Sequence, residues 1–188
     1  MSQIEIQPPS PTWPDEFQAL KARLIGLVPA GATIHHIGST AVPGLAAKDV
    51  IDIQISVDDL DEVDPARIAA AGFIFRTRPG PGDHCPPGMT LPDEELTKLF
   101  FRSTGRAAHI HIRERGRFNQ RYALLCRDFL RSHPVAAQAY VLVKQALARR
   151  FPDDADAYYD IKDPVFDIIM DGANEWALRT GWTEPPGD

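Results

Sequence analysis

The segment that most constrains the fold of this 188-residue chain is an alternation of aliphatic and polar residues at positions 50–57. From position 51 to 57 the sequence reads Ile-Asp-Ile-Gln-Ile-Ser-Val. Successive side chains of a β-strand point to opposite faces, so the aliphatic set faces a core and the polar set faces away from it. We therefore predict a strand with one buried face and one polar face, with the carboxylate of Asp52 near its start.

A glycine-containing loop precedes this strand. Residues 33–37 predict a short strand, and the loop that follows contains Gly38-Ser39 and Gly44, where glycine allows backbone angles that other residues avoid. Backbone N–H groups of such loops can bind phosphate. A carboxylate on the adjacent strand can hold a divalent cation against the same phosphate. The unit of strand, Gly-Ser loop and strand therefore points to phosphate and metal chemistry.

Two histidines share one face of a later predicted strand. Residues 97–102 and 107–113 predict a hairpin, and in its second strand His109, His111 and Arg113 alternate with isoleucines. Histidines two positions apart on a strand lie side by side. They can form a metal pair, a phosphate-binding pair or a hydrogen-bonded structural pair, and the residues alone leave these three interpretations open.

The remaining elements follow from periodicity and from helix start and stop signals. Residues 78–93 are rich in proline and glycine and predict a long irregular loop, in which His84 and Cys85 are a chance pairing because zinc sites usually need four ligands. Residues 185–188 predict a frayed tail. The other predicted elements are helices at 14–28, 65–71, 118–132, 134–150, 154–161 and 163–180, and a strand at 73–77.

Composition limits the classes of partner. Hydrophobic residues make up 44% of the chain and charged residues 24%, as in ordinary globular domains. A formal net charge of −6 argues against duplex nucleic acid as a partner. No run approaches the roughly 20 apolar residues that span a bilayer, and positions 1–10 contain no apolar run that would serve as a signal peptide. We expect one domain over residues 1–188, located in the cytoplasm, with Cys85 and Cys126 as free thiols; the oligomeric state is open.

The spacing of the first two features resembles the nucleotidyltransferase superfamily pattern. In that pattern Gly-Ser is followed, about a dozen residues later, by Asp-x-Asp or Asp-x-Glu in a strand. Gly38-Ser39 and Asp52 match it, whereas Gln54 stands at the second acidic position. An amide is a neutral ligand, so a two-metal site built on two strand carboxylates is compromised here.

A longer stretch narrows the resemblance. Residues 36–48 read His-Ile-Gly-Ser-Thr-Ala-Val-Pro-Gly-Leu-Ala-Ala-Lys, which resembles the signature of the GrpB family, and residues 108–112, 127–134 and 158–162 agree with it. The resemblance covers roughly residues 5–180. It implies an α/β (α+β) fold of nucleotidyltransferase type: a small mixed sheet at about 30–115, helices packed on one side, and a helical C-terminal portion at about 118–180.

The resemblance also implies an activity, the transfer of an NMP group from an NTP to a small-molecule or protein acceptor. In that scheme Gly38, Ser39 and Thr40 hold the phosphates, and Asp52 binds a divalent metal, Mg²⁺ or Mn²⁺, with Zn²⁺ as the alternative that imidazole ligands favour. His109 or His111 completes the metal shell or acts as a base, and Gln54 is the remaining candidate ligand. The basic residues implied in phosphate binding are Lys48, Arg127, Arg131, Lys144 and Lys162.

Two other classes of function stay open. The first is a nucleotide- or metabolite-binding module without catalysis, which Gln54 favours because one metal carboxylate is missing. The second is an accessory or interaction domain, in which the Gly-Ser loop is a tight turn and Asp52 a hydrogen-bonded carboxylate.

Overall fold

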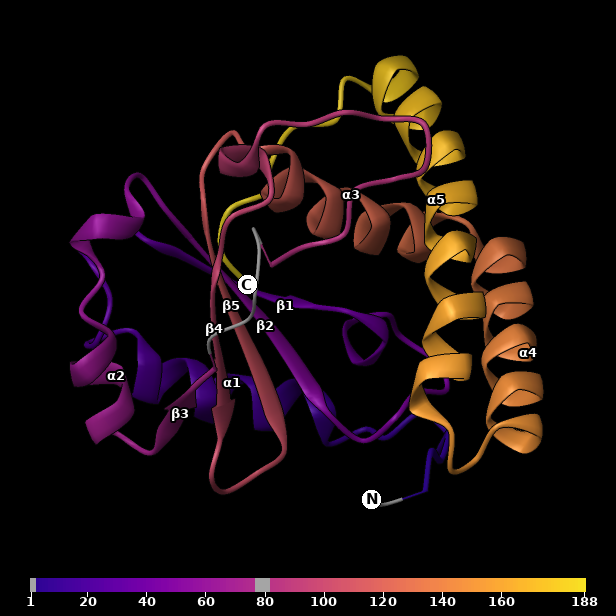
Figure 1. The fold of residues 1–188 in the computed structure, drawn as a ribbon, viewed down its shortest axis with the longest axis horizontal. Coiled ribbons are helices and arrows are strands. Elements are labelled where there is room, and N and C mark those ends of the chain that lie inside the picture. The colour runs from indigo at the N-terminus through magenta and orange to yellow at the C-terminus, as the bar shows by residue number, and fades with distance from the viewer. Residues whose placement is uncertain (1–2, 77–81) are drawn as a thin grey trace.

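The computed structural model describes residues 3–76 and 82–188 and is built around one mixed five-stranded sheet (Figure 1). The strand order is β1-β2-β5-β4-β3, with β2 and β5 parallel and every other neighbouring pair antiparallel. The α/β fold predicted from the sequence is confirmed. The strands are β1 (Thr33–Ile37), β2 (Ile51–Val57), β3 (Phe73–Phe75), β4 (Leu99–Ser103) and β5 (Ala108–Glu114).

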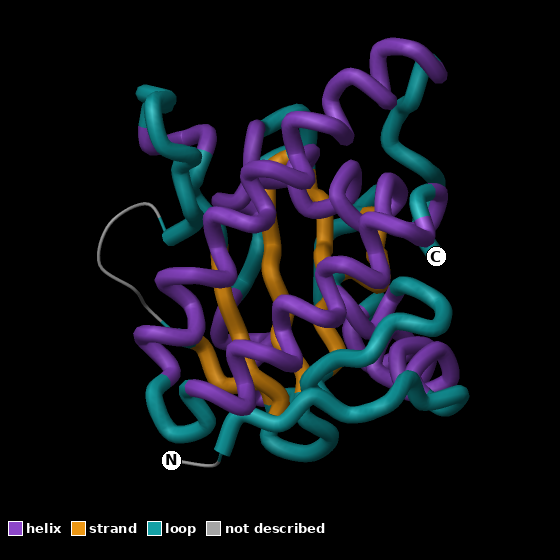
Figure 2. The backbone as a smooth tube through the Cα atoms, turned by 90° about the vertical axis from the view of Figure 1, so that its right-hand side faces the viewer, coloured by secondary structure: helices purple, strands orange, loops and turns teal. Residues whose placement is uncertain are grey.

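Helices cover both faces of the sheet, so the expectation that they pack on one side is wrong. The first two helices lie on one face and α3 on the other, with α4 and α5 packed against α3 (Figures 1 and 2). The described part of the chain has no helix that is both long and apolar enough to cross a membrane. The helices are α1 (Trp13–Leu24), α2 (Pro65–Ala70), α3 (Phe118–Ser132), α4 (Pro134–Arg150) and α5 (Ala155–Thr180).

The aliphatic face of β2 and β5 forms the main core. Ile51, Ile53 and Ile55 are fully buried, as are the isoleucines that alternate along β5. Phe17, Leu20 and Leu24 of α1 lie at helical spacing and pack onto this face. Each such side chain contributes about 1.5–3 kcal/mol when it is fully removed from water. The burial of alternate residues therefore fixes which face of β2 is polar.

The parallel register of β2 and β5 aligns their polar side chains in rows. Asp52 lies opposite His109, Gln54 opposite His111, and Ser56 opposite Arg113. Helix α3 covers the far end of this face, where the Gln120 amide donates to Ser56 Oγ over 3.1 Å. The near end, at Asp52, stays open toward the Gly-Ser loop.

Two predicted sets of element bounds are wrong. Residues 155–180 form one helix with Pro164 inside it, where we expected two helices. Proline removes one helical hydrogen bond, but Tyr158 before it and Ala173 after it are both fully buried, so packing holds the helix together across the defect. The expected strand at 73–77 ends at Phe75, and Thr77 lies outside the described residues.

The expected frayed tail instead lies along the edge of β1 (Figure 1). The backbone N–H of Asp188 donates to Ile34 O over 3.1 Å, and the Asp188 carboxylate accepts from the His36 N–H over 2.8 Å. Glu184 forms an ion pair with Arg115 at 3.2 Å. The open hydrogen-bonding edge of β1 gives the tail its partners.

Candidate functional site

The Gly-Ser loop lies directly against the carboxylate of Asp52. Ile37 at the end of β1 pairs with Asp52 on β2, so the next residue, Gly38, falls over the Asp52 side chain. Gly38 has a φ of 70°, and a Cβ placed on it would lie 2.5 Å from Asp52 Oδ2. Only glycine fits this position, for both reasons. The two parts of the predicted phosphate and metal unit are therefore in contact.

Asp52, His109 and His111 form a group of potential metal ligands. One ligand atom from each residue lies within 4.8 Å of the others. His109 Nδ1 is 3.2 Å from Asp52 Oδ1, and both side chains are about one-third exposed, at 31% and 30%. Two imidazoles and one carboxylate supply three protein ligands and leave coordination positions for water or substrate. The histidines that we predicted to act with Asp52 thus lie close enough to it for one ion to contact all three side chains.

Phe100 on the neighbouring strand β4 supports the two imidazoles. Its ring centroid lies 5.4 Å from that of His109 and 5.0 Å from that of His111. Side chains directly across a sheet pack in this way. The aromatic contact restricts both rings on the side away from the cavity.

Gln54 is placed differently from our expectation. It is fully buried, its Oε1 accepts from Arg113 Nη1 over 2.6 Å, and its Nε2 donates to Gln120 O over 3.0 Å. Both ends of the amide are therefore engaged within the fold, beneath α3. The structure assigns Gln54 a structural role between β5 and α3 in place of the expected metal contact.

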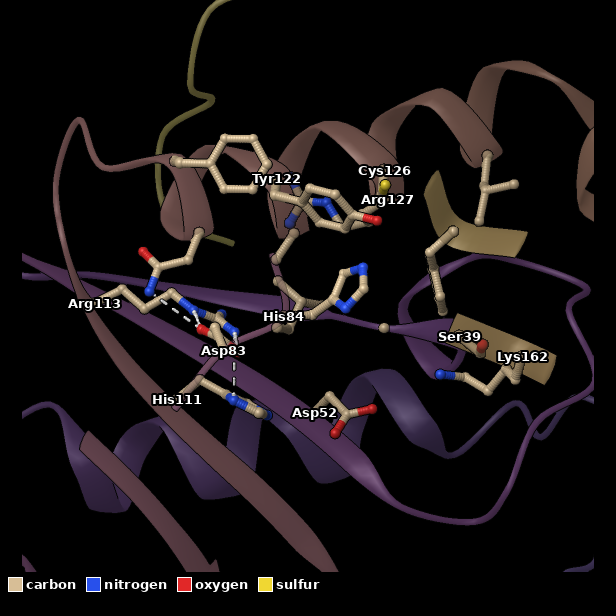
Figure 3. A pocket seen from close by; sticks show the side chains of 17 residues that line it. Ser39, Asp52, Asp83, His84, His111, Arg113, Tyr122, Cys126, Arg127 and Lys162 are labelled. Carbon is tan, nitrogen blue, oxygen red and sulfur yellow. Dashed lines mark hydrogen bonds and ion pairs between the residues drawn. The ribbon is translucent and has the colours of Figure 1, made fainter. Parts of the chain in front are cut away.

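A cavity of about 280 Å³ lies beside Asp52 and His111 (Figure 3). Its walls come from the Gly-Ser loop, from β2 and β5, from α3 and α5, and from the segment that follows the undescribed residues 77–81. The residues that β2 and β5 contribute are polar, whereas those of α3 and α5 are mostly aromatic or aliphatic, apart from Asn119, Arg127 and Lys162. The polar and charged side chains that line it include Ser39, Asp52, Asp83, His84, His111, Arg113, Arg127 and Lys162.

Three of the predicted phosphate-binding lysines gather near Ser39. Lys144, buried on α4, donates to Ser39 Oγ over 2.9 Å and to Ala46 O over 2.6 Å. Lys48 lies 4.5 Å and Lys162 5.2 Å from the ring centroid of Tyr159. Burial and the positive charges of Lys162 and Lys48 lower the pKa of Lys144 to about 7.

The other predicted phosphate contacts are engaged with the protein itself. Arg127 is buried and donates to His36 O over 3.0 Å and to Asp188 Oδ2 over 2.7 Å, although part of it lines the cavity. Arg131 Nε donates to Ala41 O over 3.0 Å. The Thr40 hydroxyl is buried against His36 Nε2 at 2.9 Å. These three residues hold the Gly-Ser loop and β1 in place.

The structure adds residues that the sequence analysis missed. Asp83 lies next to the polar side chains of β5, where its carboxylate pairs with Arg113 at 2.7 Å and with Lys98. Burial alone would raise the pKa of Asp83, but Arg113 and Lys98 outweigh it and lower that pKa to about 2. The next residue, His84, reaches the cavity and contacts Asp167 on α5.

Part of this network had a sequence signal. Arg113 follows His111 at strand spacing, and it does face the same side of the sheet. His84 had none, because its partner Asp167 lies 83 residues away and no local pattern connects a proline-rich loop to a later helix. His84 and Cys85, which we expected to be a chance pairing, go to different partners: Cys85 Sγ lies 3.6 Å from Met89 O.

Comparison with known proteins identifies the family. The model of a family described as GrpB protein matches residues 3–172. The chain belongs to the GrpB family. A solved structure described as the conserved protein GrpB from Enterococcus faecalis superposes with a TM-score of 0.76 and 26% identity, and the match covers 93% of this chain and 99% of that one. The family resemblance seen in the sequence is thereby confirmed.

Curated relatives carry two kinds of name. A UPF0157 protein from Pseudomonas aeruginosa is 36% identical over 185 residues, which cover 89% of this chain and 66% of the relative. A protein named dephospho-CoA kinase from Mycolicibacterium paratuberculosis is 34% identical over 201 residues, which cover 95% of this chain and 48% of the relative. The chain thus spans about half the length of the relatives that are named as kinases.

Proposed function

We propose that this GrpB protein is a metal-dependent nucleotidyltransferase, which transfers an NMP group from an NTP to a small-molecule or protein acceptor. One observation carries the proposal. Asp52, His109 and His111 form a group of potential metal ligands in which Asp52 lies against Gly38 of the Gly-Ser loop, and Asp52 and His111 line the cavity. A metal group and a phosphate loop in contact are what nucleotidyl transfer requires, because that chemistry is mostly positioning and charge neutralisation.

The donor set fits a borderline transition metal better than Mg²⁺. Imidazole is a preferred ligand of Zn²⁺ and binds Mn²⁺ better than Mg²⁺, which prefers oxygen ligands and keeps several waters. Asp52, His109 and His111 would hold the ion. When bound, it supplies Lewis-acid stabilisation of the charge on the reacting phosphate.

The cationic side chains near Ser39 would bind the phosphate groups of the nucleotide. The Ser39 hydroxyl and the Lys144 ammonium are in contact with each other and would bind a phosphate group at the Gly-Ser loop. Lys48 and Lys162, both next to the Tyr159 ring, add positive charge. Lysine acts on phosphate as a point charge and does not require a fixed bidentate geometry. This cluster would hold the triphosphate while Asp52 and the histidines hold the metal beside it.

The experiment that tests the proposal separates binding from chemistry. Calorimetric titration of ATP, GTP, CTP and UTP, each with Mg²⁺, Mn²⁺ or Zn²⁺, is compared between the wild type and Asp52→Ala. We expect metal-dependent binding that Asp52→Ala weakens by tenfold or more, as loss of one charged ligand would. Asp171→Ala, at an exposed carboxylate of α5 outside the cavity lining, is the matched control. The proposal fails if no nucleotide binds, or if Asp52→Ala binds as the wild type does.

A second candidate function is a nucleotide-binding module without catalysis. The observation that favours it is the state of Gln54, which is tied to Arg113 and Gln120 and leaves the site with a single strand carboxylate. Incubation with NTP labelled at the α-phosphate distinguishes the two functions. Binding without release or transfer of labelled NMP supports the module, and labelled product supports the transferase.

We do not propose the kinase activity for which some relatives are named. Only about half of such a relative is matched by this chain. A P-loop kinase needs the sequence Gly-x-x-x-x-Gly-Lys-Ser/Thr, in which lysine follows glycine directly. No glycine in this chain is followed by lysine.

A further inference from the structure

A histidine lines the cavity, and an aspartate outside the cavity lining contacts it. His84 is the third residue after the undescribed segment 77–81, and its ring points into the cavity near Tyr122 of α3 (Figure 3). Its partner Asp167 lies on α5. His84 is 42% exposed, whereas Asp167 is 16% exposed. The pair thus presents an accessible imidazole backed by a largely covered carboxylate.

Hydrogen bonding sets the orientation of the imidazole. His84 Nε2 lies 3.1 Å from Asp167 Oδ1 and 3.0 Å from Oδ2, and the Tyr122 hydroxyl donates to Oδ1 over 3.1 Å. A carboxylate accepts only, so in this contact Nε2 carries the proton. In the neutral ring, Nδ1 then holds the lone pair. Among the residues that the structure describes, Nδ1 of His84 has no hydrogen-bond partner.

The position of His84 is also fixed from the sheet side. The preceding residue, Asp83, pairs with Arg113 and Lys98 and accepts from Asn119 Nδ2 over 3.2 Å. One residue therefore joins this segment to the sheet, and the next joins it to the helical layer. These contacts hold the His84 ring at the cavity, which is where a proton acceptor must lie.

We propose that His84, oriented by Asp167, takes the proton from the acceptor in nucleotidyl transfer. This inference rests on the proposed function. The acceptor's hydroxyl or amine gives its proton to His84 Nδ1, its oxygen or nitrogen forms a bond to the α-phosphorus, and the bond from that phosphorus to the pyrophosphate oxygen breaks. Pyrophosphate leaves with the bonding electron pair, and His84 releases its proton to water after the product departs. His84 is the catalytic base, and Asp167 is a positioning residue.

The arrangement of charge in the cavity supports this division. The potential metal ligands lie on the sheet, and the Lys144 ammonium contacts Ser39 of the Gly-Ser loop, so a polyanionic nucleotide would bind there. His84 faces them across the cavity, beside the uncharged rings of Phe118 and Tyr122. A nucleophile must approach the phosphorus in line with the leaving group, from the side opposite the triphosphate tail. The acceptor is therefore an alcohol or an amine, and it does not have to carry negative charge.

The test uses His84→Gln, Asp167→Asn and the control Cys85→Ser in the full chain. Cys85 lies in the same segment as His84 but outside the cavity lining. The probes are NTP labelled at the α-phosphate with Mn²⁺, and glycerol, ethanolamine and water as acceptors. Nucleotide affinity is measured separately by calorimetry, and thermal unfolding shows whether each variant is folded.

We expect His84→Gln to lower kcat by 10²- to 10⁴-fold, the usual contribution of a general base, with an unchanged nucleotide Kd. Asp167→Asn should lower kcat less, again without a change in the KM for NTP, while Cys85→Ser matches the wild type. Wild-type kcat in a folded His84→Gln protein overturns the inference but leaves the proposed function intact. If His84→Gln does not fold, Asp167→Asn decides, and wild-type kcat there overturns the inference. Wild-type protein that binds NTP without transfer, or binds none, overturns both.

Discussion

The positive charge of Lys144 lowers the stability of the folded protein when no nucleotide is bound. It is buried on α4, and Lys48 and Lys162 add to its electrostatic cost. Replacing it with methionine keeps an unbranched side chain of similar length and removes the charge. We expect Lys144→Met to stabilise the nucleotide-free protein and to weaken nucleotide binding. Stability and function should therefore change in opposite directions.

The magnitude follows from the pKa. Burial and the two neighbouring lysines lower the pKa of Lys144 from 10.5 to about 7. At pH 7 a shift of this size corresponds to about 4 kcal/mol of lost stability, at roughly 1.4 kcal/mol per pKa unit. Losing the hydrogen bonds to Ser39 and Ala46 costs about 1 kcal/mol each. The net gain is about 2 kcal/mol, or about 4–8 °C in Tm for a chain of this length.

The same shift fixes the sign of the pH dependence. Between pH 7 and 10.5 the unfolded chain holds a proton on Lys144 that the folded chain has released, so this residue makes wild-type stability rise with pH across that window. Lys144→Met should lose this rise. Nucleotide binding should show the reverse, because a bound phosphate favours the charged lysine: wild-type binding takes up a proton and weakens as pH rises above about 7.

Urea denaturation and nucleotide titration at pH 7 and pH 9 measure both effects. Arg150→Met is the control, because Arg150 is exposed at the end of the same helix and the substitution likewise replaces a long basic side chain by methionine. Destabilisation by Lys144→Met at pH 7, together with an unchanged slope of stability against pH, would refute the reasoning. Lys144 would then be an ordinary charged residue, stabilised by its hydrogen bonds.

Three further predictions concern the sheet and its loops. Gly38→Ala should weaken Mn²⁺ binding, measured by calorimetry with the metal alone, because a Cβ there would lie 2.5 Å from Asp52 Oδ2. Asp83 has a pKa of about 2, below its ordinary 3.8, so its contribution is complete above about pH 4 and is lost as pH falls toward 2. Asp83→Asn should therefore flatten acid unfolding over that range and cost about 3 kcal/mol at pH 7, as expected when a buried ion pair is broken. Gln54→Glu should destabilise the fold by about 1–3 kcal/mol in urea denaturation without adding a metal ligand, because it turns a donor facing a backbone carbonyl into a second acceptor.

Local pattern was sufficient for most of the elements and for the centre of the site. The alternation in residues 51–57 predicted the strand and its two faces, because burial of isoleucine leaves only one register. Helices α3 and α4 have the expected bounds, with α3 ending and α4 beginning at His133-Pro134. The association of Asp52 with His109 and His111 came partly from the family resemblance, and the parallel pairing of β2 and β5 accounts for it.

Features that depend on distant partners were beyond local pattern. The break expected at Pro164 did not occur, because tertiary packing on both sides outweighs one lost hydrogen bond. The tail at residues 185–188 has the composition of a loose end, but β1 offers it an unpaired edge. The contact of His84 with Asp167 joins segments 83 residues apart. None of these partners is visible from the residues on either side of the feature.

The polar face of β2 and β5 explains why the departure at Gln54 need not abolish metal binding. Exposure falls along this face, from Asp52 and His109 at about one-third to Gln54 at zero, because α3 covers the far end. A carboxylate at position 54 would lie under α3, against a backbone carbonyl, and would face away from the open cavity. The open end holds three ligand groups, and in it imidazoles stand where a second carboxylate would otherwise be needed. A single ion held by Asp52, His109 and His111 is therefore the arrangement that this covered sheet allows.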